Sequence, residues 1–225
     1  MKNNCYKASI AMGELKRTLM YKDVEVLFLS IKYPVVSLPC TNAQTLINNQ
    51  IAMDIVDYIK HIEYLYNMAV EGYRDSVVND YPFHGYSAYM EYNITYNKNC
   101  FLSLYIDKYE FTGGAHGSTT RSSHTWELWN GTNLTLNCFF KPGTDYRHLL
   151  LEEIIKEAHY NNKQNPYLYF EDYESLIIKN FNEYSFYLTP EGIRIYYQQY
   201  DIGPYASGII EFTVPYYRIK WYPNC

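Results

Sequence analysis

The sequence contains no CxxC pair, no HExxH and no GxSxG. A zinc ribbon or a thioredoxin-like site needs closely spaced cysteine pairs, so neither is predicted. The lack of HExxH and of a nucleophile elbow removes the usual signatures of zinc-dependent and serine hydrolases. The phosphate-loop pattern GxxxxGK[ST] is also missing. We therefore expect no catalytic residues, no cofactor and no metal ion.

Positive charge is also scarce. Lysine and arginine number 19 against 24 acidic residues, which gives a net charge of −5, and no basic run occurs. Nucleic-acid binding depends on a basic surface that neutralises phosphates, so we expect no nucleic-acid partner. The mildly acidic balance would suit a basic partner.

A long apolar run is missing as well. The run at residues 26–31, VLFLSI, is too short to span a bilayer, and the first residues have no apolar signal core. The chain as written therefore predicts a cytoplasmic protein without a transmembrane segment. The alternative is an extracytoplasmic or cell-surface location.

Cysteines are few, scattered and odd in number. The simplest interpretation is buried or free thiols, but one or two disulfides stay open as an alternative if the protein is exported. The five residues are Cys5, Cys40, Cys100, Cys138 and Cys225.

Tyrosine, in contrast, is abundant, with 28 residues in a chain of 225. One explanation is an AT-rich genome, because tyrosine has AT-rich codons. The other is a recognition surface, because tyrosine supplies a large contact area at a low entropic cost. The two explanations are compatible.

The first half of the chain predicts strands followed by one long helix. Residues 24–31 are rich in β-forming residues, and apolar residues then recur at helical spacing over residues 42–71. Thr41 and Gln44 form a capping-box pattern at the start of the helix, and Gly72 lies just past its expected end. Residues 75–87 are turn-like and mark a junction. We expect two domains, residues 1–85 and residues 86–225.

The second half predicts hairpins and two shorter helices. Residues 90–106 alternate as a hairpin, and Asn130-Gly131 is a strong turn signal from which residues 134 and 136 should return to the sheet. Helices are expected at residues 145–160 and 170–180, and strands at 184–188, 193–197 and 210–214. Strands and helices are segregated, which favours an α+β fold with a mostly antiparallel sheet. The long helix belongs to the N-terminal half.

Residues 111–117, FTGGAHG, are the most unusual segment. A phosphate site would need a helix after the glycines, but a strand follows. His116 and His124 lie roughly 26 Å apart on an extended strand, too far to share a metal ion. Two adjacent glycines between strands permit positive φ and close backbone approach, so we interpret the segment as a glycine bulge.

A second glycine-containing loop follows at residues 201–208, DIGPYASG. Loops on a rigid sheet often carry binding residues, so both loops are candidates for a recognition surface. The candidate binding residues are Tyr109, Gly113, Gly114, His116 and Tyr205.

Four segments carry a resemblance to a known family: residues 105–117, 126–136, 138–140 and 200–208. Together they resemble the extracytoplasmic domain family found in the anti-sigma factor RsiV. Residues 33–34 and the capped helix after them resemble the small domain that also occurs beside the catalytic domain of the peptidoglycan deacetylase PdaC. Together the two resemblances cover most of the chain.

The resemblance implies a non-catalytic α+β module. In RsiV this domain recognises lysozyme, and in the deacetylase the chemistry belongs to a separate domain whose metal-binding motifs are not found here. The sequence has neither a sigma-binding segment nor a preceding membrane helix, so only the binding module carries over. We expect a binding module of a bacterial envelope or stress-response system that recognises a lysozyme-like protein or a peptidoglycan fragment. The alternative is a glycan-modifying enzyme, a deacetylase or a hydrolase, with His116 in its cleft.

Overall fold

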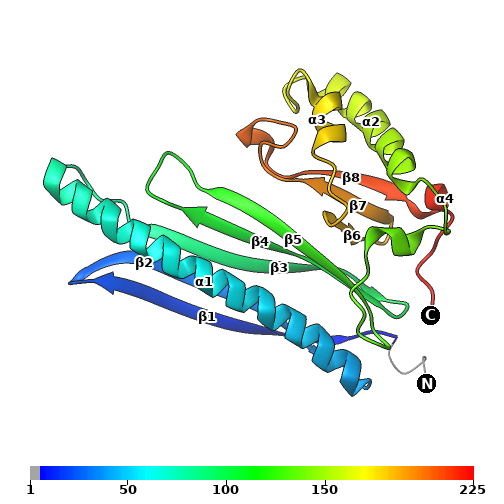
Figure 1. The fold of residues 1–225 in the computed structure, drawn as a ribbon, viewed down its shortest axis with the longest axis horizontal. Helices are drawn as coiled ribbons and strands as arrows, with labels where there is room; N and C mark the ends of the chain where they lie inside the picture. The colour runs from blue at the N-terminus through cyan, green and yellow to red at the C-terminus, as the bar shows by residue number, and fades with distance from the viewer. Residues whose placement is uncertain (1–5) are drawn as a thin grey trace.

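The computed structural model describes residues 6–225 and arranges them in two sheets with helices on their outer faces (Figure 1). The elements in chain order are β1 (Ser9–Tyr21), β2 (Val24–Ser37), α1 (Thr41–Asn79), β3 (Tyr86–Lys98), β4 (Phe101–Phe111), β5 (Ser118–Glu127), η2 (Leu136–Phe139), α2 (Tyr146–Gln164), α3 (Tyr173–Lys179), β6 (Phe186–Leu188), β7 (Gly192–Tyr197), η3 (Tyr205–Ser207), β8 (Ile210–Pro215) and α4 (Tyr216–Ile219).

The larger sheet has the strand order β1-β2-β3-β4-β5. Its neighbouring strands are antiparallel except for β2 and β3, which run parallel. Parallel neighbours need a crossover connection, and α1 provides it by returning the chain from the end of β2 to the start of β3. The predicted α+β class with a mostly antiparallel sheet is therefore confirmed.

Helix α1 is longer than the sequence pattern predicts. It does not end at residue 71 but continues to Asn79, and Asp80 takes the left-handed C-cap position with φ 54°. Gly72 lies inside the helix because the buried side continues past it to Ser76. Despite this length, no helix among the described residues is apolar enough over a sufficient span to cross a membrane.

The predicted capping box at the start of α1 is wrong. Cys40, not Thr41, is the N-cap residue, and within residues 6–225 no side-chain hydrogen bond caps the helix there. The Gln44 side chain instead accepts a hydrogen bond from the Leu38 amide at 2.8 Å. Gln44 therefore secures the segment between β2 and α1 rather than the helix end.

The first half of strand β4, residues 101–106, is covered on both faces. Alternate residues of a strand point to opposite sides, so one set packs under α1 and the other faces the smaller sheet. Toward the smaller sheet, the Ser103 hydroxyl accepts a hydrogen bond from the Leu188 amide at 2.9 Å, and the Tyr105 ring lies 5.3 Å from the Tyr187 ring. The set under α1 is fully buried: Leu102, Leu104 and Ile106.

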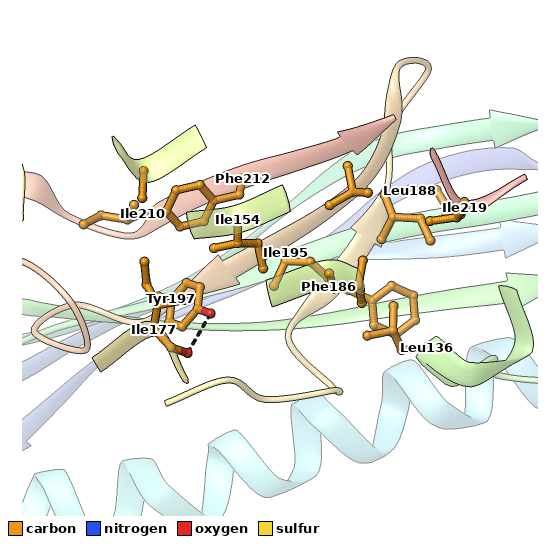
Figure 2. Close-up of a cluster of buried hydrophobic side chains, with 14 of the residues drawn as sticks. Leu136, Ile154, Ile177, Phe186, Leu188, Ile195, Tyr197, Ile210, Phe212 and Ile219 are labelled. Carbon is orange, nitrogen blue, oxygen red and sulfur yellow. Dashed lines mark hydrogen bonds between the residues drawn. The ribbon is translucent and has the colours of Figure 1, made fainter. Parts of the chain in front are cut away.

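The smaller sheet has the order β6-β7-β8 and two different faces. Its apolar face packs against α2 and α3, and within this core the Tyr197 hydroxyl donates to the Ile177 carbonyl oxygen at 3.0 Å (Figure 2). Its other face is polar and aromatic and lies against β4 and β5. The apolar face presents Phe186, Leu188, Ile195, Tyr197 and Phe212.

Arg121 of β5 joins the two sheets. Its Nε and Nη2 donate to the two carboxylate oxygens of Asp107 at 2.6 and 2.7 Å, and its Nη1 donates to Glu211 of β8. The guanidinium lies 3.6 Å from the centre of the Tyr105 ring, and the Tyr187 hydroxyl donates to Glu211 at 2.5 Å. Burial opposes the positive charge, but hydrogen bonding to Asp107 and the two nearby carboxylates outweigh it and raise the pKa of Arg121.

The larger sheet is continuous across residue 85, where two domains are predicted to meet. Leu27 of β2 lies opposite Tyr86 of β3, so sheet hydrogen bonding joins residues from both expected domains. The core under α1 draws on β1 to β5, whereas the second core lies between the smaller sheet, α2 and α3. The division into residues 1–85 and 86–225 stays a prediction.

The turn at Asn130-Gly131 forms as predicted, with Gly131 at φ 75° and its amide donating to the Glu127 carbonyl oxygen at 2.8 Å. The expected return strand does not form. Asn133 forms an isolated bridge to Trp126, with the Leu134 amide donating to the Thr125 carbonyl oxygen at 2.7 Å, and Leu136 then begins η2. Leu136 is buried in the second core, and that burial draws the chain away from β5.

The cysteines are not simply free thiols. Cys100, at the turn between β3 and β4, is joined by a disulfide to Cys225 across a sequence separation of 125 residues. Cys40 is also disulfide-bonded, and Cys138 is a free, exposed thiol. Cys5 lies outside the described residues. The disulfide alternative is therefore the correct one for Cys40, Cys100 and Cys225.

Replacing Arg121 with methionine should lower the free energy of unfolding by about 3 kcal/mol, because Asp107 then loses its cation in a partly buried site. Among the described residues, Glu211 keeps only Arg194 as a cationic partner, whose Nη1 lies 3.3 Å from its carboxylate. Urea denaturation measures the change.

The matched control is Arg218→Met, since the Arg218 side chain is 45% exposed and its pair with Glu153 does not join the two sheets. The free energy of unfolding of the control should stay close to that of the unmodified protein. Equal losses in both variants would contradict the role assigned to Arg121.

Candidate functional site

Residues 112–117 form the loop that closes the hairpin between β4 and β5. Gly113 has φ 83°, a region that favours glycine, and an added Cβ would lie 3.3 Å from the His84 carbonyl oxygen. Gly114 has open space around it. The pairing of β4 with β5 runs without a register shift, so the predicted bulge is wrong and the segment is a hairpin loop.

Gly117 allows the loop to close tightly against Tyr109. An added Cβ would lie 2.4 Å from the Glu110 carbonyl oxygen and 2.5 Å from the Tyr109 ring, distances that real Cβ atoms do not adopt. The lack of a side chain at Gly117 therefore lets the Tyr109 ring lie over the end of the hairpin. His116, the residue before it, is exposed.

The second loop, residues 198–209 between β7 and β8, is hydrogen-bonded to the segment between α2 and α3. Ile202 is fully buried, and its carbonyl oxygen accepts a hydrogen bond from the Phe170 amide at 3.1 Å. The Ser207 hydroxyl donates to the Leu168 carbonyl oxygen at 2.7 Å. Gly203 approaches that same carbonyl so closely that an added Cβ would lie 2.5 Å from it. These contacts anchor the base of the loop.

The two loops meet at the same end of the molecule (Figure 1). The rings of His116 and Tyr205 stack with their centres 3.8 Å apart and their planes at 21°. Tyr200 lies beside them, 6.0 Å from Tyr205. The Thr119 amide donates to the Gln199 side chain at 2.6 Å, so the backbone of β5 also holds the second loop. We call Tyr109, His116, Tyr200 and Tyr205 the two-loop surface.

A row of aromatic rings extends this surface across the larger sheet. Tyr109 of β4 lies 6.1 Å from Tyr89 of β3, which lies 5.8 Å from Phe28 of β2. Ala88 and Met90, on either side of Tyr89, are buried under α1, so the row lies on the opposite face. We call Phe28, Tyr89 and Tyr109 the aromatic row.

His116 contacts a backbone carbonyl and an aromatic ring. Its Nδ1 lies 3.1 Å from the Gly117 carbonyl oxygen, which can only accept, so Nδ1 carries a proton. A general base is normally oriented by a second group and lies beside a nucleophile. A backbone carbonyl and the Tyr205 ring are the neighbours of His116. This arrangement suits binding through ring stacking.

Two further histidines, His124 and His61, form pairs with carboxylates. His124 Nε2 lies 2.8 Å from Asp54 of α1, and the Asn133 amide nitrogen lies 2.9 Å from its Nδ1. His61 of α1 lies 3.0 Å from Glu110. These pairs attach α1 to the sheet on the face away from the aromatic row. Over residues 6–225, no three His, Cys, Asp or Glu side chains gather closely enough to hold a metal ion.

Of the five predicted binding residues, the structure brings Tyr109, His116 and Tyr205 to one surface. Gly113 packs against the His84 backbone, and a Cβ added at Gly114 would meet no atom of the described residues within 4 Å. Sequence reasoning missed Tyr200 and Tyr89. The alternation in β3 places Tyr89 on one face of that strand, but only the register with β4 sets it opposite Tyr109.

Comparison with known families supports the predicted resemblance at the level of domains. A family model described as Deacetylase PdaC matches residues 21–119, and one described as Protein of unknown function (DUF3298) matches residues 137–217. The first loop of the two-loop surface falls in the first match and the second loop in the second. Residues 105–117, which resemble the RsiV-type domain in sequence, thus lie in the PdaC match.

Solved structures show the same fold. A DUF3298 family member from Bacteroides fragilis is 20% identical, with a TM-score of 0.74, and the alignment covers 96% of this chain and 94% of that chain. A DUF3298 family protein from Pseudomonas aeruginosa is 15% identical, with a TM-score of 0.64 and coverage of 98% and 95%. No curated protein matches the chain at a significant level. These identities show the fold alone.

Asp201, at the base of the second loop, makes stability depend on pH. Burial raises the pKa of its carboxyl group, against the opposing hydrogen bond from the Gln198 amide. The folded protein thus holds this proton more tightly than the unfolded chain does. The stabilisation that Asp201 gives the folded protein is fully present below the pKa that its carboxyl group has in the unfolded chain. It is lost as pH rises through the higher pKa of the folded state.

Asp201→Asn should therefore gain stability relative to the unmodified protein as pH rises from about 3 to 7, because asparagine cannot ionise yet still accepts from Gln198. Urea denaturation at several pH values measures the difference between the two proteins. Parallel pH profiles would contradict this account of Asp201.

Proposed function

We propose that the chain is a non-catalytic binding module of a bacterial envelope or stress-response system, and that it recognises its partner through the two-loop surface. The observation that carries the proposal is the stacking of His116 on Tyr205, which joins two loops that are distant in sequence. Both loops are held at their bases, so the rings are presented with little conformational freedom to lose on binding. Tyr200 is 53% exposed, and Tyr109 and Tyr205 are half-buried. Pre-oriented tyrosines are common anchors of binding interfaces.

The partner that we propose is a lysozyme-like protein. The net charge of −5 suits a basic protein, and the sequence resembles an RsiV-type domain that recognises lysozyme. An aromatic side chain at such a surface supplies contact area with only two side-chain torsions to fix.

A peptidoglycan fragment is the second candidate, and the aromatic row favours it. The apolar faces of sugar rings pack on aromatic rings, and Phe28, Tyr89 and Tyr109 form a continuous series with Tyr89 36% exposed. A glycan bound there would run from the sheet face toward the two loops.

We further propose that the module works in an extracytoplasmic, oxidising compartment. The Cys100–Cys225 disulfide supports this location, because such bonds persist in oxidising compartments and are rare in the bacterial cytoplasm.

Tyr205→Ala should weaken binding of lysozyme by ten- to a hundredfold, which is about 1.4–2.8 kcal/mol, because it removes the ring that His116 stacks on. Isothermal titration calorimetry against lysozyme, and separately against soluble peptidoglycan fragments, measures the affinity. The matched control is Tyr217→Ala, since Tyr217 is 64% exposed on α4 and lies outside the two-loop surface.

The control should bind as the unmodified protein does, and thermal unfolding should show that both variants remain folded. Absence of heat with either ligand at high concentration would count against the binding proposal. Release of acetate or of reducing sugar from peptidoglycan, lost in His116→Ala, would instead support the enzyme alternative.

Protein isolated from its native host should contain the Cys100–Cys225 bond. Alkylation before and after reduction, followed by mass spectrometry of the peptides, measures which thiols are protected. Cys138 should be alkylated without reduction because it is free and exposed. Direct alkylation of Cys100 and Cys225 in the host would contradict the oxidising location.

A further inference from the structure

Strand β1 is an open edge of the larger sheet. It runs for 13 residues, Ser9–Tyr21, and the strand order gives it one neighbour, β2. In an antiparallel pair, alternate residues direct their amide and carbonyl groups away from the partner strand. Among the described residues, a row of these groups along β1 is therefore available to pair with another strand, apart from the Met20 carbonyl oxygen, which accepts from the Tyr66 hydroxyl at 3.0 Å.

At the opposite edge of the same sheet, several of the outward backbone groups of β5 already have hydrogen-bond partners. At β5 the Arg121 amide donates to the Gln198 side chain at 2.9 Å, and the Gln198 side-chain nitrogen donates back to the Arg121 carbonyl oxygen at 2.7 Å. The Thr119 amide donates to Gln199, and the Leu134 amide donates to the Thr125 carbonyl oxygen at 2.7 Å. The fold thus covers the β5 edge with polar groups of its own.

An apolar groove runs beside the open edge, between β1 and α1. Its volume is about 520 Å³. Leu15, Leu19 and Ile62 line it, with Ile59 and Met20 at the surface, 38% and 46% exposed. A strand added to β1 would place every second side chain over this groove.

The charges along β1 fit a second copy of β1. Glu14 and Lys16 lie on the same face and pair with each other at 2.8 Å. In an antiparallel pair of two β1 strands centred on Leu15, Glu14 of each copy lies opposite Lys16 of the other. Opposite charges directly across a strand pair are stabilising, and like charges are destabilising.

We infer that two copies of this chain associate through antiparallel pairing of their β1 strands, centred on Leu15. The pairing joins the two larger sheets into one continuous sheet with both α1 helices on the same side. Leu15 of one copy lies beside Leu15 of the other at the floor of a trough formed by both grooves. The two-loop surface belongs to the opposite end of the sheet order, near β5, and stays free in each copy.

A charge swap tests the inference, with Cys138→Ser in every protein so that its exposed thiol cannot form an intermolecular disulfide. Sedimentation equilibrium up to about 200 µM should show a mass rising from 26.7 kDa toward twice that value. Glu14→Lys alone and Lys16→Glu alone should each weaken the dimer by roughly tenfold, because each puts like charges opposite one another.

An equimolar mixture of the two single variants should associate as tightly as the unmodified protein, since every opposing pair is then complementary. The double variant with both substitutions should do the same. The mixture is informative because each single variant lacks the Glu14–Lys16 pair within its own strand, so only pairing between copies can restore association. A monomer at the highest concentration, or single variants that associate as well alone as when mixed, would overturn the inference.

Discussion

The contact between Arg121 and the carboxylates of Asp107 and Glu211 is the interaction on which the arrangement of the two sheets depends. Asp107 belongs to the larger sheet and Glu211 to the smaller one, so a single guanidinium spans the boundary between them. A buried cation is costly unless it is fully paired, and here hydrogen bonds and the Tyr105 ring satisfy it. The sheets meet through polar and aromatic side chains, while their apolar faces are covered by helices.

The two-loop surface follows from this packing. Arg121 lies shortly after the first loop in the chain, and its backbone amide and carbonyl are held by Gln198 at the start of the second loop. Fixing the two sheets through Arg121 therefore sets the distance between His116 and Tyr205. The surface contains one loop from each of the two family matches, so the arrangement belongs to the whole chain rather than to either part.

Much of the fold could be predicted from local patterns. The long apolar stripe of α1 and the alternation in β3 and β4 are properties of consecutive residues. All three elements form, although α1 runs eight residues past its expected end at residue 71. The errors arose where distant contacts outweigh local preference. The Gln44 side chain accepts a hydrogen bond from the Leu38 amide instead of capping the helix. Leu136 packs in the second core instead of continuing a strand beside β5. Glycines 113 and 114 were recognised as turn-forming, but whether they make a bulge or a hairpin loop depends on the pairing of β4 with β5.

The sequence by itself determined the α+β class, most of the elements and the identity of the two glycine-containing loops, because hydrophobic periodicity and turn chemistry act over a few residues. It also singled out Tyr109, His116 and Tyr205 as candidates. Only the tertiary structure decided that His116 stacks on Tyr205, that Cys100 bonds to Cys225, and that β5 is a covered edge while β1 is open. Each of these depends on how segments far apart in the chain are brought together. That information lies in the packing of the two sheets and not in any single stretch of sequence.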